Sequence, residues 1–232
     1  MNNTVGCYAS TELISFLGQD GAQTFFNTSF NEAYHSKIGP IIEAEHKFVK
    51  ASSIDLLLKE NKRIKILDLF FGLGYNSGIA LDYAYKSSPS PIIEITAVEK
   101  DLEIINKIST LEVPQWYLKW KDLLSLLSKQ KQVIHEKAVI NLYLDSIFNV
   151  LEELPRGYFD VIFFDPFSHK TAPEFWTDEF LVKIFGLLAD NGTLTTYSGL
   201  KRVERLANNL GLKSEHISPL GRKKHSLAII KP

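Results

Sequence analysis

The sequence predicts an α/β fold built on a seven-stranded, mostly parallel sheet that ends in an antiparallel hairpin strand. From residue 64 onward, short apolar runs alternate with segments of helical periodicity, as expected when helices cover both faces of a parallel sheet. The last two apolar runs have no helix between them, which predicts a hairpin. A glycine-rich turn follows the first of these runs.

Each predicted strand of this sheet is short and mainly apolar, which suits burial on both faces. Strands are expected at residues 64–70, 92–98, 138–144, 158–165 and 192–198, and the closing hairpin at 212–218 and 225–231. Helices are expected at 76–86, 101–110, 146–154, 173–189 and 201–211, and residues 113–130 form a helical or irregular insertion.

Residues 1–60 are interpreted as a small N-terminal extension packed on a core domain of residues 61–232. Apolar runs at 11–17 and 23–27 flank Asp20 and Gly21, a turn pair that predicts a β-hairpin. An irregular stretch follows, and the apolar spacing of residues 41–58 predicts one or two helices.

The composition is that of a soluble globular protein. Of the 232 residues 45% are hydrophobic and 23% charged, which is enough apolar material for a core without disulfides or metal. The single cysteine excludes an internal disulfide framework and argues against a zinc site, so no metal is expected.

Location and charge restrict the partners. No apolar run approaches the roughly 18 residues of a membrane span, and the first residues lack the pattern of a signal peptide, so a cytoplasmic protein is predicted. The net charge of −1 means that any nucleic acid must be bound by a local basic patch.

The turn after the first core strand is a candidate cofactor loop. Its glycines have the spacing G-x-G-x-x-x-G, which differs from that of dinucleotide-binding loops. The preceding Asp68 would repel a pyrophosphate but suits the ammonium of S-adenosylmethionine, and the helix that follows can meet the ligand's carboxylate. The predicted cofactor-binding residues of this loop are Asp68, Gly72, Gly74, Asn76 and Gly78.

Two further acids end the next two strands. Glu99 stands where a carboxylate can accept hydrogen bonds from both ribose hydroxyls, and Asp145 where it can accept from the adenine amino group. The alternative is that these acids only cap the helices that follow them.

The fourth strand ends at Asp165, followed by Pro166 and Phe167, and these three residues are the predicted catalytic group. A primary alkylamine must lose a proton before it can attack a methyl donor. Asp165 can hold that amine, align it and offset the charge growing on nitrogen. The alternative is a cap for a helix at 174–189.

The strand pattern resembles the Rossmann-like architecture of class I methyltransferases, and a motif after the fourth strand narrows the resemblance. Residues 165–181, 190–199 and 219–230 look like the MnmC-type methyltransferase family, whose pattern D-x-F-x-P-x-x-x-P-x-x-W is matched by Asp165, Phe167, Pro173 and Trp176. His169 departs from it, because a proline is usual there. Residues 20–27 and 34–48 also resemble the family, with Glu43 at a recurrent acidic position, so the resemblance extends from about residue 20 to 230.

The resemblance implies a stand-alone tRNA methyltransferase without the flavin-dependent oxidase domain of bifunctional members. Such an enzyme converts 5-aminomethyl-(2-thio)uridine at the wobble position to 5-methylaminomethyl-(2-thio)uridine and leaves S-adenosylhomocysteine as product. Glu43 joins the cofactor-binding set. The expected partners are the anticodon stem-loop of tRNA and the enzymes that install the aminomethyl group. The predicted substrate- or RNA-binding residues are Tyr34, His35, Lys170, Trp176, Arg222, Lys223 and Lys224.

Two alternatives remain open from the residues. One keeps the fold but changes the reaction to methyl or aminopropyl transfer onto a small amine or a protein. The other is a non-catalytic module that binds RNA or a protein. The presence of Asp68, Glu99 and Asp165 argues against the second alternative.

Overall fold

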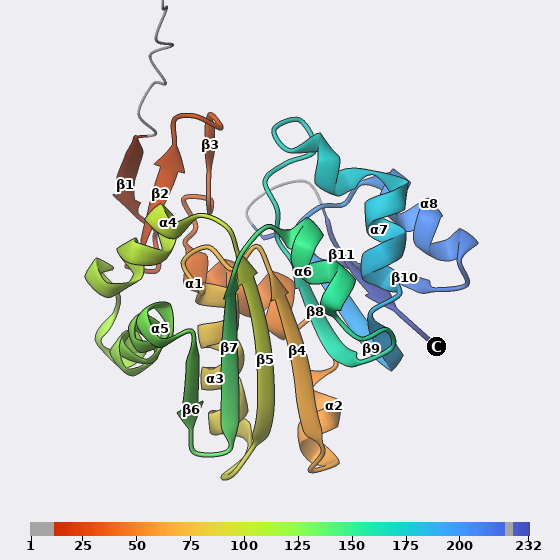
Figure 1. Cartoon of the computed structure of the whole chain (residues 1–232), viewed down its shortest axis with the longest axis horizontal. Coiled ribbons are helices and arrows are strands. Elements are labelled where there is room, and N and C mark those ends of the chain that lie inside the picture. Colours follow the sequence, from red (N-terminus) through yellow and green to blue (C-terminus); the bar gives the residue numbers. More distant parts are fainter. Residues whose placement is uncertain (1–11, 221–224) are drawn as a thin grey trace, which may run out of the picture.

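The computed structural model describes residues 12–220 and 225–232 (Figure 1). Eight strands form a large sheet in the order β10-β11-β9-β8-β4-β5-β7-β6, and three form a small sheet in the order β1-β2-β3. The strands of the large sheet are β4 (Arg63–Leu69), β5 (Ile92–Glu99), β6 (Gln132–His135), β7 (Ala138–Leu144), β8 (Phe159–Phe164), β9 (Leu188–Thr196), β10 (Lys213–Ile217) and β11 (Ser226–Ile230). Those of the small sheet are β1 (Leu13–Leu17), β2 (Gln23–Asn27) and β3 (Glu32–Ala33).

Strand β4 lies in the middle of the large sheet and pairs in parallel with β5 and β8. The chain builds one side first, through β5 and β7, and then returns across β4 to add β8 and β9. Strand β11 is antiparallel to both β9 and β10. The order in which the chain adds strands reverses between β4 and β8. In α/β proteins such a switch point opens a crevice at the carboxyl ends of the strands, where ligands bind.

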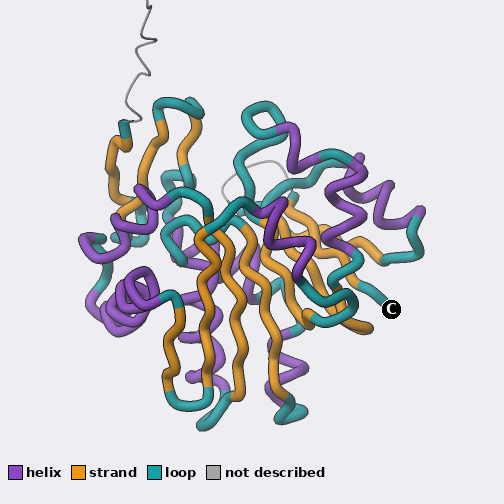
Figure 2. The backbone as a smooth tube through the Cα atoms, in the orientation of Figure 1, coloured by secondary structure: helices purple, strands orange, loops and turns teal. Residues whose placement is uncertain are grey.

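Helices cover both faces of the large sheet (Figures 1 and 2). One face is covered by α1 (Pro40–Glu43), the π-helical turn η1 (Ala44–Val49), α2 (Ile54–Lys59), α3 (Tyr75–Ser87), α4 (Leu102–Lys107) and α5 (Leu118–Gln130). The other is covered by α6 (Ile147–Glu153), α7 (Asp178–Phe185) and α8 (Lys201–Asn209). Short 3₁₀ turns lie at η2 (Ile108–Thr110), η3 (Gln115–Tyr117) and η4 (Pro173–Trp176).

The alternation of side chains along β4 explains why its sequence is apolar on both faces. Ile64 and Ile66 join the buried cluster under α3, whereas Leu67 and Leu69 join the cluster under α6 and α7. The same alternation turns Asp68 toward α3. The start of α3 therefore faces a buried carboxylate.

The small sheet stands at the carboxyl ends of β4, β5 and β7, at the top of Figures 1 and 2. The predicted hairpin is confirmed, because β1 and β2 are antiparallel around Asp20 and Gly21. The Asp20 carboxylate accepts hydrogen bonds from the backbone N–H groups of Ile41 and Ile42 at 2.8 and 3.1 Å. It thereby fixes the start of α1 against the hairpin.

The predicted α/β fold with a mostly parallel sheet is confirmed, and the differences lie in short elements. The sheet has eight strands rather than seven, because β6 pairs at the edge with β7. Its four residues are too few for a visible alternation, and Ile134 at its centre is exposed. Strand β3 lies in the stretch expected to be irregular, and residues 41–58 contain α1, η1 and α2.

The predicted helix at 173–189 divides into η4 and α7. The side chain of Thr177 accepts a hydrogen bond from the N–H of Phe180 and caps α7. In the described ranges no helix has the length and apolar character needed to cross a membrane.

Candidate functional site

A cavity of about 280 Å³ opens at the carboxyl ends of the central strands. The small sheet, the start of α6 and the loop after β8 supply much of its wall. Its charged lining is mainly acidic, with two lysines, Lys47 and Lys100, against seven carboxylates: Glu32, Glu43, Glu99, Asp101, Asp145, Asp165 and Glu174. This excess of negative charge favours a cationic ligand.

The glycine loop turns the chain sharply from β4 into α3. Gly72 and Gly74 have φ angles of 53° and 77°, in the left-handed region where a side chain is disfavoured. Phe70 adopts a φ of 65° in the same loop, a conformation that strains a bulky residue. The sequence therefore holds a tight, strained turn next to the cavity.

Asp68 lies beneath this loop and is fully buried. Its Oδ2 accepts hydrogen bonds from the N–H and Oγ of Ser77 at 3.1 and 2.6 Å, whereas Oδ1 has no hydrogen-bond partner among the described residues. Burial raises the pKa of Asp68 to about 8, and the nearby Asp165 and Glu99 carboxylates add to that rise. A cation at the loop would favour the ionised form of this carboxyl group.

Glu99 closes β5 and fixes the loop from the opposite side. One oxygen, Oε2, accepts from the N–H of Gly72 at 2.9 Å, and Oε1 accepts from the N–H groups of Lys100 and Asp101 at 2.8 and 2.9 Å. Burial raises the pKa of Glu99, and these hydrogen bonds oppose that rise. Because Asp101 caps α4, Glu99 is not the helix cap. A carboxylate offers about four acceptor positions, so Oε2 keeps room for one further donor.

Asp145 follows β7 at the exposed rim of the cavity. Its Oδ1 accepts hydrogen bonds from the N–H of Ser146 at 2.6 Å and from the Asn149 amide at 3.0 Å. This oxygen therefore bonds next to the start of α6, but it accepts from no backbone N–H within the helix, and α6 has no side-chain cap in the described part of the chain. Oδ2 is left for another donor.

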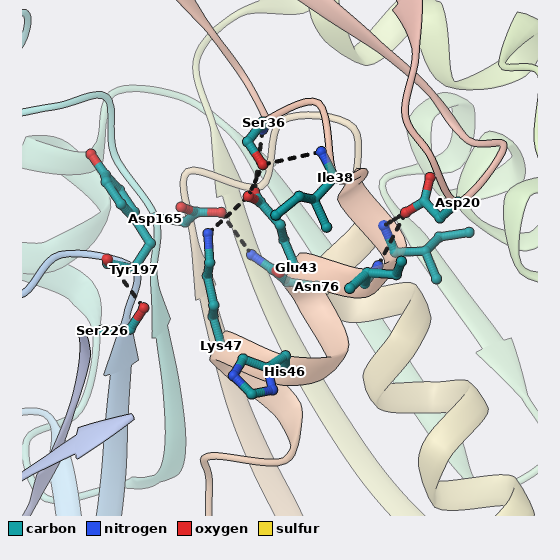
Figure 3. A network of polar contacts seen from close by, with 12 residues as sticks. Asp20, Ser36, Ile38, Glu43, His46, Lys47, Asn76, Asp165, Tyr197 and Ser226 are labelled. Carbon is teal, nitrogen blue, oxygen red and sulfur yellow. Dashed lines mark hydrogen bonds and ion pairs between the residues drawn. The ribbon is translucent and has the colours of Figure 1, made fainter. Parts of the chain in front are cut away.

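Asp165 follows β8 and faces Asn76, Glu43 and Lys47 (Figure 3). The Asn76 amide donates to its Oδ2 at 3.1 Å. Burial raises the pKa of Asp165 to about 7, with Asn76 and Lys47 acting against the rise and Glu43 adding to it. The helix-cap alternative is wrong for this residue, since Thr177 caps α7.

The loop after β8 is held by the small sheet. Glu32 on β3 accepts hydrogen bonds from the N–H and Oγ of Ser168 and from the Thr171 hydroxyl, at 2.6–3.2 Å. The ring of Phe167 lies 4.8 Å from that of Phe30 and 5.0 Å from that of Tyr34, centroid to centroid. These contacts fix the residues next to Asp165.

A family model described as an S-adenosyl-L-methionine-dependent methyltransferase matches residues 107–232, more than half of the chain. The chain belongs to this family. The matched part of the methyltransferase includes Asp145 and Asp165. The glycine loop and Glu99 precede it, so their assignment rests on the geometry of the cavity.

Relatives place the chain within the family. It is 29% identical over 199 residues to the tRNA 5-methylaminomethyl-2-thiouridine biosynthesis bifunctional protein MnmC of Campylobacter hominis, covering 80% of this chain and 28% of that protein. The crystal structure of MnmC2 from Aquifex aeolicus superposes with a TM-score of 0.84 at 29% identity, over 97% of this chain and 72% of that one. The chain is thus a methyltransferase domain of the MnmC type.

An uncharacterized protein of Methanocaldococcus jannaschii is 31% identical over 215 residues. That match covers 89% of this chain and 56% of the relative. The methyltransferase therefore spans about half of one of these curated relatives and about a quarter of the other.

The structure brings eight of the predicted site residues to the cavity lining: Tyr34, His35, Glu43, Glu99, Asp145, Asp165, Pro166 and Phe167. Asp68, Gly72 and Gly74 are not part of that lining, and the structure corrects the placement of three further residues. Asn76, expected to contact the cofactor, donates to Asp165. A Cβ on Gly78 would lie 2.0 Å from the Tyr117 hydroxyl oxygen, so this glycine allows α3 to pack against η3. Trp176 cannot stack on a base, because it is 3% exposed and its Nε1 donates to the Phe167 carbonyl at 2.9 Å.

The predicted substrate-facing residues are only partly at the cavity. Tyr34 and His35 line it, together with Pro166 and Phe167. Burial lowers the pKa of His35 to about 4, which leaves a neutral ring bonded to the Thr24 hydroxyl at 2.8 Å. Lys170 is exposed on the loop after β8. Three predicted phosphate contacts lie outside the described residues: Arg222, Lys223 and Lys224.

Sequence reasoning missed Glu32 and Lys47, which both line the cavity. The spacing of Lys47 four residues after Glu43 is that of a helical ion pair and could have drawn attention to it. Glu32 carries no such signal, because its partners Ser168 and Thr171 are distant in the sequence. Glu43 lines the cavity as part of the ion pair with Lys47.

Proposed function

We propose that this methyltransferase transfers the methyl group of S-adenosylmethionine to the amine of 5-aminomethyl-(2-thio)uridine at the wobble position of tRNA. The observation that carries the proposal is Asp165, a partly buried carboxylate held by Asn76 at the wall of an acidic cavity. The names of the MnmC relatives support the tRNA substrate.

The residues present fit S-adenosylmethionine. Among residues 12–220 and 225–232, Asp68 has a buried oxygen without a hydrogen-bond partner, and Glu99 Oε2 accepts from the Gly72 N–H alone. We assign the methionyl end to the loop at Gly72 and Gly74, a ribose hydroxyl to Glu99, and the adenine amino group to Asp145. When bound, this cofactor supplies an electrophilic methyl group on a sulfonium.

Asp165 then acts on the acceptor. An alkylammonium that enters the cavity donates a hydrogen bond to the Asp165 carboxylate. Because the pKa of Asp165 is about 7, the carboxylate can also take up the proton that the nitrogen must lose. Phe167 and Tyr34 shape the wall beside it and limit water near the amine. The tRNA phosphates are assigned to the basic residues at 222–224.

The test compares acceptors. The purified chain is incubated with methyl-labelled S-adenosylmethionine and either tRNA lacking the methyl group, free alkylamines or a protein mixture. Label in tRNA alone supports the proposal. Label in small amines or in protein would show that the substrate is not tRNA. Label in none of the three acceptors would contradict methyl transfer to tRNA, to alkylamines and to protein.

A further inference from the structure

Lys47 is a largely buried lysine at the wall of the cavity. Its side chain is 11% exposed, as is that of Glu43, and its Nζ lies 2.8 Å from the Glu43 Oε1. Lysine is seldom buried without a partner, and a buried ion pair adds little to stability compared with apolar residues of similar size. A contribution to folding stability therefore does not by itself explain the Lys47–Glu43 ion pair at the cavity wall.

The backbone and Ser36 hold the pair in place. Glu43 ends α1 and Lys47 lies on η1, a π-helical turn of a kind often found at functional sites. The Glu43 carboxylate also accepts from the Ser36 hydroxyl and from the Ser36 N–H. Burial raises the pKa of Glu43, but Lys47 and His35 outweigh it and lower the pKa, so Glu43 stays ionised.

The ammonium of Lys47 points between Glu43 and Asp165 (Figure 3). It has three N–H donors, and within residues 12–220 and 225–232 one acceptor is seen, Glu43. The remaining donors face the part of the cavity where Asp165 is held by Asn76.

The other charges around Asp165 are negative. Glu43 on α1 and Glu32 on β3 oppose its ionisation, and Lys47 on η1 favours it. Asp68 on β4 has the higher pKa and opposes the ionisation of Asp165 only when it is itself ionised. Lys100, the second lysine of the lining, is exposed at the rim. The other ionisable groups of the lining are Tyr34, His35, Glu99, Asp101, Asp145, Glu174 and Tyr197.

We propose that Lys47 is a positioning residue that keeps the Asp165 carboxylate charged and ready for the acceptor amine, while Glu43 holds the Lys47 ammonium and offsets its charge. The inference rests on the proposed function, in which Asp165 binds the amine. Lys47 counters the effect of the Glu43 charge on Asp165. Because the Glu43–Lys47 pair is neutral as a whole, it does so without adding net positive charge that would repel a cationic acceptor.

The test measures the titration of Asp165 directly in the full chain. Protein labelled with ¹³C at its aspartate carboxyl groups is titrated by NMR, and the Asp165 signal is identified by its loss in Asp165→Asn. In Lys47→Met the midpoint should rise by about one pH unit or more, as when a nearby opposite charge is removed. Glu43→Gln should lower the midpoint, and the double variant should return it toward that of the parent.

The control is Lys50→Met, which removes an exposed lysine one residue beyond η1 that pairs with Glu45. Lys50→Met should leave the Asp165 midpoint unchanged. Lys47→Arg keeps the positive charge, so its midpoint should lie close to that of the parent. A midpoint that stays at the parental value in both Lys47→Met and Glu43→Gln overturns the inference. If Lys47→Met does not fold, the test rests on Glu43→Gln. An Asp165 midpoint that does not fall in Glu43→Gln contradicts the proposal that Glu43 offsets the charge of Lys47.

The acidic limb of the pH dependence of kcat should move with the NMR midpoint. A purely structural role for Lys47 would lower activity equally at every pH. Absence of methyl transfer by the parent would count against the proposed function alone, since the NMR midpoint does not depend on activity.

Discussion

Asp165 is a partly buried acid with one oxygen held by Asn76, and its desolvation raises its pKa to about 7. Its partner in the proposed reaction is the acceptor amine, which is absent when only cofactor is bound. Asp165→Ala should therefore bind S-adenosylmethionine almost as the parent does and lose about two to four decades of kcat. Calorimetry measures the binding and single-turnover methyl transfer measures the rate.

Asp160 offers a matched control on the same strand. Its carboxylate accepts from the N–H of Lys65 at 2.8 Å, away from the cavity, so Asp160→Asn should keep the parental rate. Asp165→Asn separates two roles of the side chain. Substantial activity in this variant indicates that Asp165 mainly orients the amine, and activity as low as that of Asp165→Ala indicates that its negative charge is required. If both Asp165 variants work at the parental rate, the catalytic assignment is wrong.

Glu99 is expected to matter for cofactor binding. Glu99→Ala removes the proposed ribose partner and frees three backbone N–H groups, that of Gly72 in the glycine loop and those of Lys100 and Asp101 after β5. Its affinity for S-adenosylmethionine should fall by about 1–3 kcal/mol, or roughly 5- to 150-fold in Kd by calorimetry. Glu94→Ala, on the same strand but bonded to Tyr158, should bind normally. An unchanged Kd in Glu99→Ala would mean that the ribose lies elsewhere.

Asp68 predicts a pH dependence of cofactor binding. Burial raises its pKa from 3.8 to about 8, so between these pH values the folded protein keeps a proton on Asp68 that the unfolded chain loses. The free energy of unfolding therefore falls as the pH rises from about 3.8 to about 8. A bound cation favours the ionised acid. Binding below pH 8 should therefore release protons, and affinity should rise as the pH rises toward 8.

Calorimetry in buffers of different ionisation enthalpy measures that release. Asp68→Asn should release fewer protons and bind more weakly, with a flatter dependence on pH. Parental affinity that does not change between about pH 6 and pH 8 would argue that no cation lies near Asp68.

Among the elements, the loop after β8 depends on β3. Glu32→Gln replaces the carboxylate that accepts from Ser168 and Thr171 by an amide with one acceptor oxygen. The loop should become more mobile, and kcat/KM should fall by roughly tenfold, which corresponds to about 1.4 kcal/mol. Cofactor affinity should change little. Glu12→Gln, next to β1, is the control. Equal kcat/KM in the two variants would mean that the contact of Glu32 with the loop after β8 does not support catalysis.

The elements that the sequence predicts well are those with strong local signals. Residues 64–70 are an apolar run followed by glycines, and they form the central strand β4. The Asp-Gly turn predicts the β1–β2 hairpin for the same reason. Strands β3 and β6 are two and four residues long and form because a neighbour offers an edge, which a local pattern cannot show. The π-helical turn η1 has no sequence signature either.

For the whole molecule, the sequence predicts the strand-end acids of the site but not the contacts between them. Glu99, Asp145 and Asp165 end parallel strands, so the fold alone places them around one crevice. The links that hold the site, Asn76 to Asp165 and Glu32 to the loop after β8, join residues far apart in the chain. The division into residues 1–60 and 61–232 stays a prediction, and Phe25 and Phe48 share a buried cluster with Ile66 of β4.

The most direct test of the central claim follows the nucleoside product. tRNA that carries 5-aminomethyl-(2-thio)uridine is incubated with S-adenosylmethionine and the parent or Asp165→Ala protein, then digested and analysed by mass spectrometry. With the parent, the 5-aminomethyl nucleoside should decrease as a product with one additional methyl group appears, and with Asp165→Ala this conversion should be slower by at least about two decades. A parent reaction that leaves the 5-aminomethyl nucleoside unchanged, or equal conversion by the two proteins, would contradict the account.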